Sequence, residues 1–159
     1  MEHRTRVISP RNERRSKGLT GIAGEYYVAA ELSRRGFIAT ITLRNTEGID
    51  IMASRPDQCE MYFIQVKTNQ TQSQRWILSK QSEKSPSGKY FYVFVSLKGD
   101  RDRPDFFIVP GTIVAKQIKK DHQRWLSAPG RDGSLHKDGS MRTFITKGDE
   151  YLDKWELLK

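Results

Sequence analysis

The residues from Tyr90 to Leu97 form an almost unbroken apolar run, Tyr-Phe-Tyr-Val-Phe-Val-Ser-Leu. The run lacks the polar alternation of a half-exposed strand, so it predicts a central strand that is buried on both faces. Other elements must then cover both sides of its sheet. This requirement constrains the fold of the whole chain.

Further segments supply the rest of that sheet and its helices. Strands are expected at 38–43, 48–53, 61–68 and 106–109, with a short edge strand at 144–145. One helix is expected from Thr20 to Arg35, capped by Thr20 and followed by Gly36, and a second at 113–126. The stretch from 69 to 89 shows little regular pattern. The expected fold class is α/β, a sheet flanked by helices.

The length of 159 residues favours one domain with a substantial core. We expect a basic N-terminal arm at 1–18 and a single domain at 19–159, with its core at 19–126 and a C-terminal elaboration at 127–159. The arm is either a solvated tail or a segment that contacts phosphates.

The net charge of +9 favours a polyanionic partner, with nucleic acid ahead of an anionic membrane. No signal sequence and no stretch of transmembrane length is recognised, so the expected location is the cytoplasm. The single cysteine, Cys59, excludes an internal disulfide framework and a cysteine-rich zinc site.

The strand at 61–68 carries two polar residues, Gln65 and Lys67, on one face. Strand alternation places Tyr62, Ile64 and Val66 on the opposite face. A lysine among apolar neighbours is costly to bury unless a charge offsets it, and Asp50 on the preceding strand can do so. Asp50 and Lys67 therefore form either a stray ion pair or part of a reaction centre.

The first helix offers two acidic residues that could join Asp50. Successive residues are about 100° apart around the helix axis. Viewed along this axis, the apolar residues cover a sector with Val28 at one edge and Ala30 at the other, and Glu25 falls inside this sector. Glu31 falls on the other side, with Tyr27 and the arginines, and is expected to face water. Glu25 is thus expected to face the sheet, or else to lie at the edge of the apolar stripe and interact with the helix dipole.

Glu25, Asp50 and Gln65 together provide the hard oxygen ligands that Mg²⁺ prefers. A lysine next to such a cation can orient a water molecule or stabilise developing negative charge. This combination suits phosphodiester cleavage.

These residues resemble the PD-(D/E)XK nuclease superfamily. The resemblance rests on Gly24-Glu25 in a helix closed by Gly36-Phe37, then Gly48-Ile49-Asp50-Ile51, then Gln65-Val66-Lys67, and it covers roughly residues 18–97. It is nearest to Holliday-junction resolvases and to the Gln-x-Lys variant of some restriction and homing enzymes. The resemblance implies a restriction-endonuclease-like core with a mixed central sheet.

The resemblance also implies an Mg²⁺- or Mn²⁺-dependent DNA endonuclease. Glu25, Asp50 and Gln65 would bind the metal, and Lys67 would complete the catalytic set. Ile49 replaces the name-giving proline, and the neutral Gln65 replaces a carboxylate, which predicts weaker Mg²⁺ binding. A homodimer is compatible with it, because two-fold nucleases pair their sites to cut both strands.

Basic residues outside this set are expected to contact the nucleic acid: Arg11, Arg14, Arg15, Lys17, Arg75, Lys80 and Lys84. Trp76 follows Arg75 in the segment after the lysine strand, and it is either a packing anchor or a platform for a base. Two other classes of function stay open. The chain could bind nucleic acid on the nuclease scaffold without cleaving it, or serve as a protein-interaction domain.

Overall fold

The computed structural model describes residues 15–43, 48–84, 88–99 and 101–158. Its helices are α1 (Lys17–Ser33) and α2 (Gly111–Ser127), with short 3₁₀ turns η1 (Lys80–Glu83) and η2 (Trp155–Leu157). Its strands are β1 (Ile38–Ile41), β2 (Ile51–Ser54), β3 (Met61–Asn69), β4 (Arg75–Ser79), β5 (Tyr90–Ser96), β6 (Asp105–Pro110) and β7 (Met141–Ile145). No helix in these ranges is long and apolar enough to cross a membrane.

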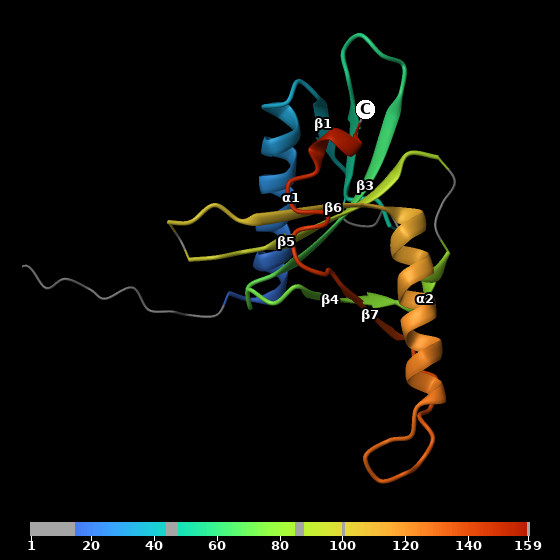
Figure 1. Ribbon diagram of the computed structural model, residues 1–159. Helices are drawn as coiled ribbons and strands as arrows, with labels where there is room; N and C mark the ends of the chain where they lie inside the picture. The colour runs from blue at the N-terminus through green and yellow to red at the C-terminus, as the bar shows by residue number, and fades with distance from the viewer. Residues whose placement is uncertain (1–14, 44–47, 85–87, 100, 159) are drawn as a thin grey trace, which may run out of the picture.

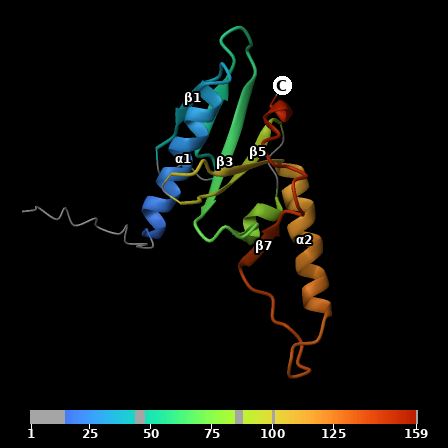
Figure 2. The ribbon, with the colours of Figure 1, turned by 60° about the vertical axis from the view of Figure 1, so that its left-hand side comes forward.

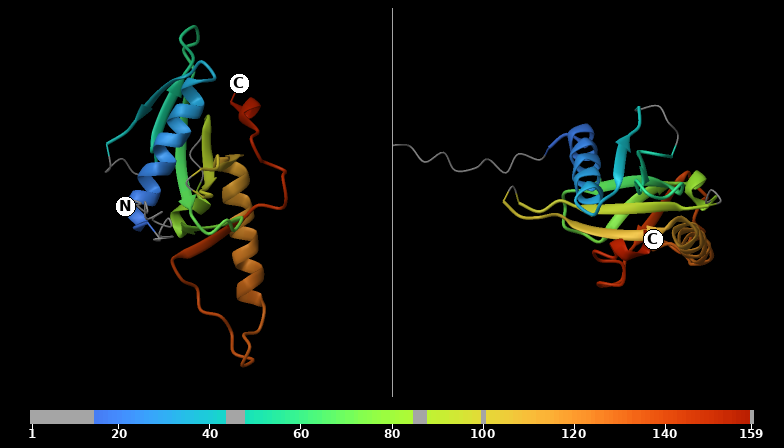
Figure 3. Two further views of the ribbon diagram at one scale, coloured as in Figure 1. Left: turned by 90° about the vertical axis from the view of Figure 1, so that its left-hand side faces the viewer. Right: turned by 90° about the horizontal axis from the view of Figure 1, so that it is seen from above.

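Five of the strands form the main sheet, in the order β1-β2-β3-β5-β6. β3 and β5 are parallel and the other pairs are antiparallel, so the sheet is mixed, as expected. β5 lies between β3 and β6 and all of its residues are buried, which confirms the prediction from its apolar run. Helix α1 lies on one side of the sheet and α2 on the other (Figures 1 and 3).

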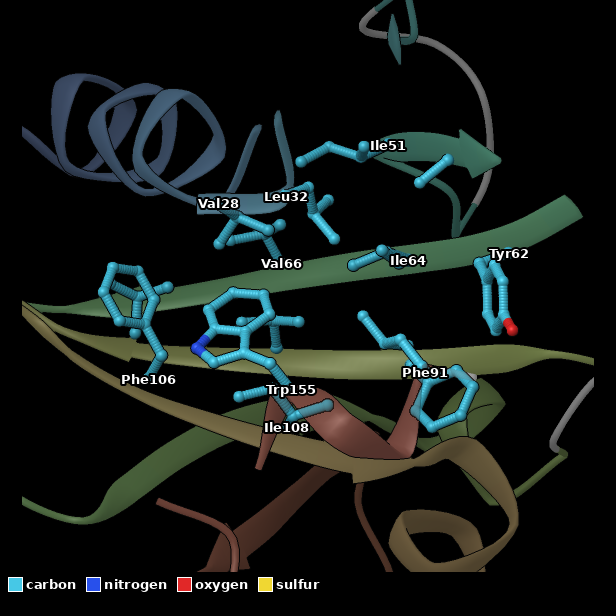
Figure 4. Packing of buried hydrophobic residues seen from close by; sticks show 14 of the residues in the cluster. Val28, Leu32, Ile51, Tyr62, Ile64, Val66, Phe91, Phe106, Ile108 and Trp155 are labelled. Carbon is cyan, nitrogen blue, oxygen red and sulfur yellow. The ribbon is translucent and has the colours of Figure 1, made fainter. Parts of the chain in front are cut away.

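Two apolar clusters hold these layers together. On one face, Val28 and Leu32 of α1 pack over Ile64 and Val66 of β3, with Trp155 from the C-terminal turn beside them (Figure 4). On the other face, α2 packs with β4 and β7 against the aromatic side chains of β5 and β6. The alternation predicted for β3 is confirmed, since Tyr62, Ile64 and Val66 belong to the first cluster and Phe63 borders the second.

The start and the rotation of α1 differ from the prediction. The helix begins at Lys17, inside the expected arm, and its cap is Ser16, whose Oγ accepts a hydrogen bond from the Leu19 N–H. The predicted cap, Thr20, is buried in the helix and donates to the Ser16 carbonyl. Gly36 has a φ of +84°, as expected of a residue just past a helix.

The prediction that Glu31 faces water is wrong. Glu31 is only 7% exposed and lies in the stripe that α1 turns toward the protein, whereas Tyr26 is 65% exposed. The carboxylate accepts hydrogen bonds from Arg34, Arg35 and Arg103, and Arg103 also pairs with Asp153. Burial alone would raise the pKa of Glu31, but these arginines outweigh it and hold the pKa below its usual value. Glu31 thus joins α1 to the C-terminal segment.

The stretch from 69 to 89 contains a strand that the sequence did not reveal. β4 pairs with β7 in a separate two-stranded sheet, which we call the ribbon (Figure 2). Trp76 of β4 is 3% exposed, and its Nε1–H donates to the Val95 carbonyl at 3.3 Å. Trp76 is therefore a packing anchor, and the alternative that it stacks on a base is wrong.

Gly24 brings α1 into close contact with Thr68 of β3. A Cβ added at Gly24 would lie 1.9 Å from Thr68 Oγ1 and 3.0 Å from Thr68 Cβ, an atom that cannot move without the strand. We expect Gly24→Ala to lower the free energy of unfolding, because overpacking costs about 1–3 kcal/mol and outweighs a helix-propensity gain of about 0.5–1 kcal/mol.

Urea denaturation measures this change. Gly21→Ala is the matched control, since an added Cβ there meets nothing within 4 Å, and it is expected to stabilise the helix. Equal stabilisation by both substitutions would contradict the close contact.

Candidate active site

Asp50 directly precedes β2, at the end of the hydrogen-bond ladder between β2 and β3. The Asp50 N–H donates to the Ile64 carbonyl at 2.9 Å, and the Val66 N–H donates to Asp50 Oδ2 at 2.7 Å. The carboxylate thus takes the position of a backbone acceptor at the point where the two strands separate. Both bonds hold the Asp50 side chain against the middle of β3.

The charge of Asp50 is costly in this position. Burial raises the pKa of the carboxyl above its ordinary value, although the hydrogen bond from Val66 and the charge of Lys67 act in the opposite direction. The electrostatic interaction between Asp50 and Lys67 supports the predicted proximity of the two side chains. A bound cation would relieve the same penalty.

Gln65 is held by Tyr90 of the neighbouring strand β5. The Tyr90 hydroxyl lies 2.6 Å from the Gly48 carbonyl oxygen and 3.1 Å from Gln65 Oε1. Burial, followed by Tyr92 and the charge of Asp50, raises the pKa of Tyr90 well above its usual value, so the hydroxyl stays protonated. One buried hydroxyl therefore connects the turn that precedes Asp50 with the amide of Gln65.

Gln65 and Lys67 open into a cleft of about 440 Å³. Its main-sheet side also includes Gly48, Tyr90 and Tyr92. The opposite side comes from β4, η1 and the residue after η1: Ile77, Leu78, Ser79, Gln81, Ser82 and Lys84. A second hollow of about 300 Å³, near Arg15 and Lys98, includes none of the predicted catalytic residues.

Glu25 comes from the helix layer, whereas the other three predicted residues lie in or next to strands of the main sheet. It is half-buried on α1, next to Gly24, which contacts Thr68 at the end of β3. Helix α1 covers the face of β3 that carries Ile64 and Val66, whereas Gln65 and Lys67 point to the other face. The structure brings Asp50, Gln65 and Lys67 together, and a role for Glu25 stays a prediction.

The predicted DNA-binding residues lie in several places. Arg11 and Arg14 are outside the described residues. Arg15 exchanges backbone hydrogen bonds with the Gln70 side chain, and Lys17 is exposed at the start of α1. Lys84 lines the cleft, Lys80 forms an ion pair with Asp138 at 2.7 Å, and Arg75 is exposed on the ribbon. Among these residues in the described ranges, Lys84 is the one that lines the cleft with Gln65 and Lys67.

Sequence reasoning missed two parts of the site, the hydroxyl of Tyr90 and the ribbon side of the cleft. Tyr90 reads as one more apolar member of a central strand. The ribbon could not be recognised from local sequence patterns, because β7 lies far from its partner β4 in the sequence. A usable signal was the alternation of Trp76 and Leu78 with Arg75, Ile77 and Ser79.

Comparison with known proteins identifies the fold. No family model and no curated protein matches the chain. Among solved structures, the bacterial homing endonuclease I-Ssp6803I is similar, with a TM-score of 0.52 and 12% sequence identity. The match covers 91% of this chain and 92% of that one. The chain therefore has a nuclease-like α/β fold, and the comparison extends over the C-terminal part as well as the predicted core.

Proposed function

We propose that the protein is a metal-dependent DNA endonuclease of the PD-(D/E)XK type. The observation that carries the proposal is the convergence of Asp50, Gln65 and Lys67 where β2 separates from β3, next to a cleft. The fold supports it, as does the net charge of +9. The similar structure belongs to a homing endonuclease, which favours DNA as the substrate.

The donor chemistry fits Mg²⁺ or Mn²⁺. Asp50 Oδ2 accepts one hydrogen bond, so the carboxylate retains lone pairs for a cation, and Gln65 adds a neutral amide oxygen. Within the described ranges, no group of three or more Asp, Glu, His or Cys residues could hold a metal. A site with few carboxylates suits Mg²⁺, which keeps several waters and also binds substrate phosphates.

Each side chain then has a defined task. Asp50 and Gln65 would hold the cation, and Glu25 is proposed to add a carboxylate from the helix layer. A bound cation would supply Lewis-acid chemistry toward the scissile phosphate and toward a water molecule. The ammonium group of Lys67 stabilises the negative charge that develops on the phosphate.

Tyr90 is proposed to orient the amide of Gln65. A hydroxyl has one proton, and the 2.6 Å contact with the Gly48 carbonyl uses it. The amide satisfies Tyr90 when its NH₂ group donates to the hydroxyl, since amide oxygen and nitrogen can exchange places by a flip. The Gln65 oxygen is then directed away from Tyr90 and is available to a metal.

We expect Tyr90→Phe to weaken Mn²⁺ binding by about 10- to 100-fold, the usual effect of losing a group that orients a metal ligand. Isothermal titration with Mn²⁺ measures the change without any need for turnover. Tyr92→Phe is the matched control, because Tyr92 lies opposite Gln65 on β5 and lines the same cleft, whereas the described hydroxyl contact with Gln65 Oε1 comes from Tyr90. Equal affinities of wild type and Tyr90→Phe would contradict the orienting role.

Incubation of the purified protein with duplex, branched and single-stranded DNA tests the proposed activity. Cleavage is expected with Mg²⁺ or Mn²⁺ and none with EDTA. Cleavage that persists in EDTA would contradict metal dependence.

A second candidate function is DNA binding without cleavage, and the neutral Gln65 favours it. Salt-dependent DNA binding with no cleavage under any divalent cation would support this candidate.

A further inference from the structure

The outer face of the ribbon is an exposed surface of mixed chemistry. The side chains of β4 and β7 alternate, so that Trp76, Leu78 and Phe144 are buried beneath the ribbon. The outward residues are Arg75, Ile77, Ser79, Met141, Thr143 and Ile145. Three of them are large apolar side chains with 54% (Ile77), 69% (Met141) and 47% (Ile145) exposure. Apolar residues gathered on one exposed face commonly mark an interaction surface.

This face continues directly from the candidate active site. Ile77 and Ser79 line the cleft together with Gln65 and Lys67. A ligand long enough to extend from Lys67 across the cleft therefore passes over the ribbon. Arg75 is the only charged residue among the six outward positions, so the face suits a polyanion.

We propose that the outer face of the ribbon enters the major groove of DNA and reads bases next to the phosphate that is cut. This inference rests on the proposed function and adds the determinant of its sequence preference. The major groove admits a two-stranded β-ribbon. Arg75 suits the O6 and N7 acceptors of guanine, and the apolar side chains suit thymine methyl groups. The hydroxyls of Ser79 and Thr143 can bond to either kind of base edge.

The ribbon is held firmly enough to read bases by position. Trp76 is fixed to the Val95 carbonyl, and Gln117 of α2 donates to the Ile145 carbonyl at 2.7 Å. The buried guanidinium of Arg142 on β7 pairs with Glu83 of η1. These contacts connect the ribbon to β5, α2 and η1, so its outward side chains keep a constant register relative to Lys67.

A second copy of the chain is the competing occupant. Six outward side chains fall well short of the roughly 20–30 residues that each partner contributes to a stable protein interface. The outer face of the ribbon is also continuous with the cleft, which favours DNA over a second copy as its occupant. The oligomeric state of the wild type and of a ribbon variant then decides between the two.

The test uses the full chain and a pool of duplex DNA with a randomised central segment. Binding preference is selected with Asp50→Asn, which is expected not to cleave, and cut-site preference is sequenced with the uncut pool as reference. Arg75→Gln and Ile77→Thr, introduced singly, are each expected to reduce discrimination at one or two base positions by roughly tenfold or more, the effect of losing one good contact. Leu135→Thr removes an apolar side chain that is even more exposed, at 78%, from the segment between α2 and β7, and it is expected to change nothing.

The outcomes separate the two proposals. If the wild type cuts the pool and the ribbon variants keep its base preference, the reading face is overturned and the nuclease stands. If no DNA is cut with any divalent cation but the selection returns a ribbon-dependent preference, the nuclease is overturned and the reading face stands. A wild-type dimer that becomes monomeric in Ile77→Thr would assign the face to a second copy and overturn the reading role.

Discussion

Asp50→Asn is expected to lower the single-turnover cleavage rate by about 1,000-fold or more, because several kcal/mol of metal-based charge stabilisation correspond to that factor. The amide oxygen of asparagine can still accept the hydrogen bond from the Val66 N–H, so the contact at the point where β2 separates from β3 is retained. Cleavage rates are compared under excess enzyme with Mg²⁺. Asp57→Asn, on the exposed turn between β2 and β3, is the matched control and should cleave normally.

The same substitution should leave the protein at least as stable as the wild type. Burial raises the folded-state pKa of Asp50, so the ionised carboxylate subtracts from stability at pH values above that pKa. The penalty disappears as the pH falls and the folded state takes up the proton. Thermal unfolding should therefore show the greatest advantage of Asp50→Asn near neutral pH and a smaller one in acid. A variant that unfolds much more easily at neutral pH would contradict this account.

Lys67→Met is expected to lower the cleavage rate by about 100- to 1,000-fold, the usual cost of removing one group that stabilises transition-state charge. Methionine keeps most of the apolar stem and removes the ammonium group. DNA binding should weaken only slightly, because one phosphate contact among many is lost. The measurement is the single-turnover rate at saturating enzyme, with affinity determined separately in Ca²⁺.

Lys84→Met is the matched control, since Lys84 lines the same cleft from the opposite side. It should weaken affinity at moderate salt and leave the saturated rate close to that of the wild type. A Lys67→Met rate equal to that of Lys84→Met would assign Lys67 to binding rather than to chemistry.

The strands were largely predictable from the sequence because their periods are short and their faces differ in polarity. The apolar run of β5 and the alternation of β3 are local signals, and they placed Gln65 and Lys67 on one face. The rotation of α1 was not predictable from a count of apolar residues. Gly24 brings the helix against Thr68 and sets which side faces the sheet, so Tyr26 is exposed and Glu31 is buried.

The ribbon and Tyr90 depend on contacts between segments that are far apart in the sequence. β4 is short, and its partner β7 follows long after it, so pairing and register arise only in the folded chain. The hydroxyl of Tyr90 acquires its role because β5 lies parallel to β3 with Tyr92 opposite Gln65. The periodicity of a sequence carries no signal of such a cross-strand contact.

Diffraction from crystals soaked in Mn²⁺, recorded at an energy where manganese scatters anomalously, tests whether Asp50 and Gln65 bind a metal ion. A peak is expected about 2.0–2.6 Å from a carboxylate oxygen of Asp50 and the amide oxygen of Gln65, and it is expected to be lost in Asp50→Asn. A soaked crystal of an Mn²⁺-active preparation with no peak beside Asp50, or with its peak at another group of residues, would contradict it.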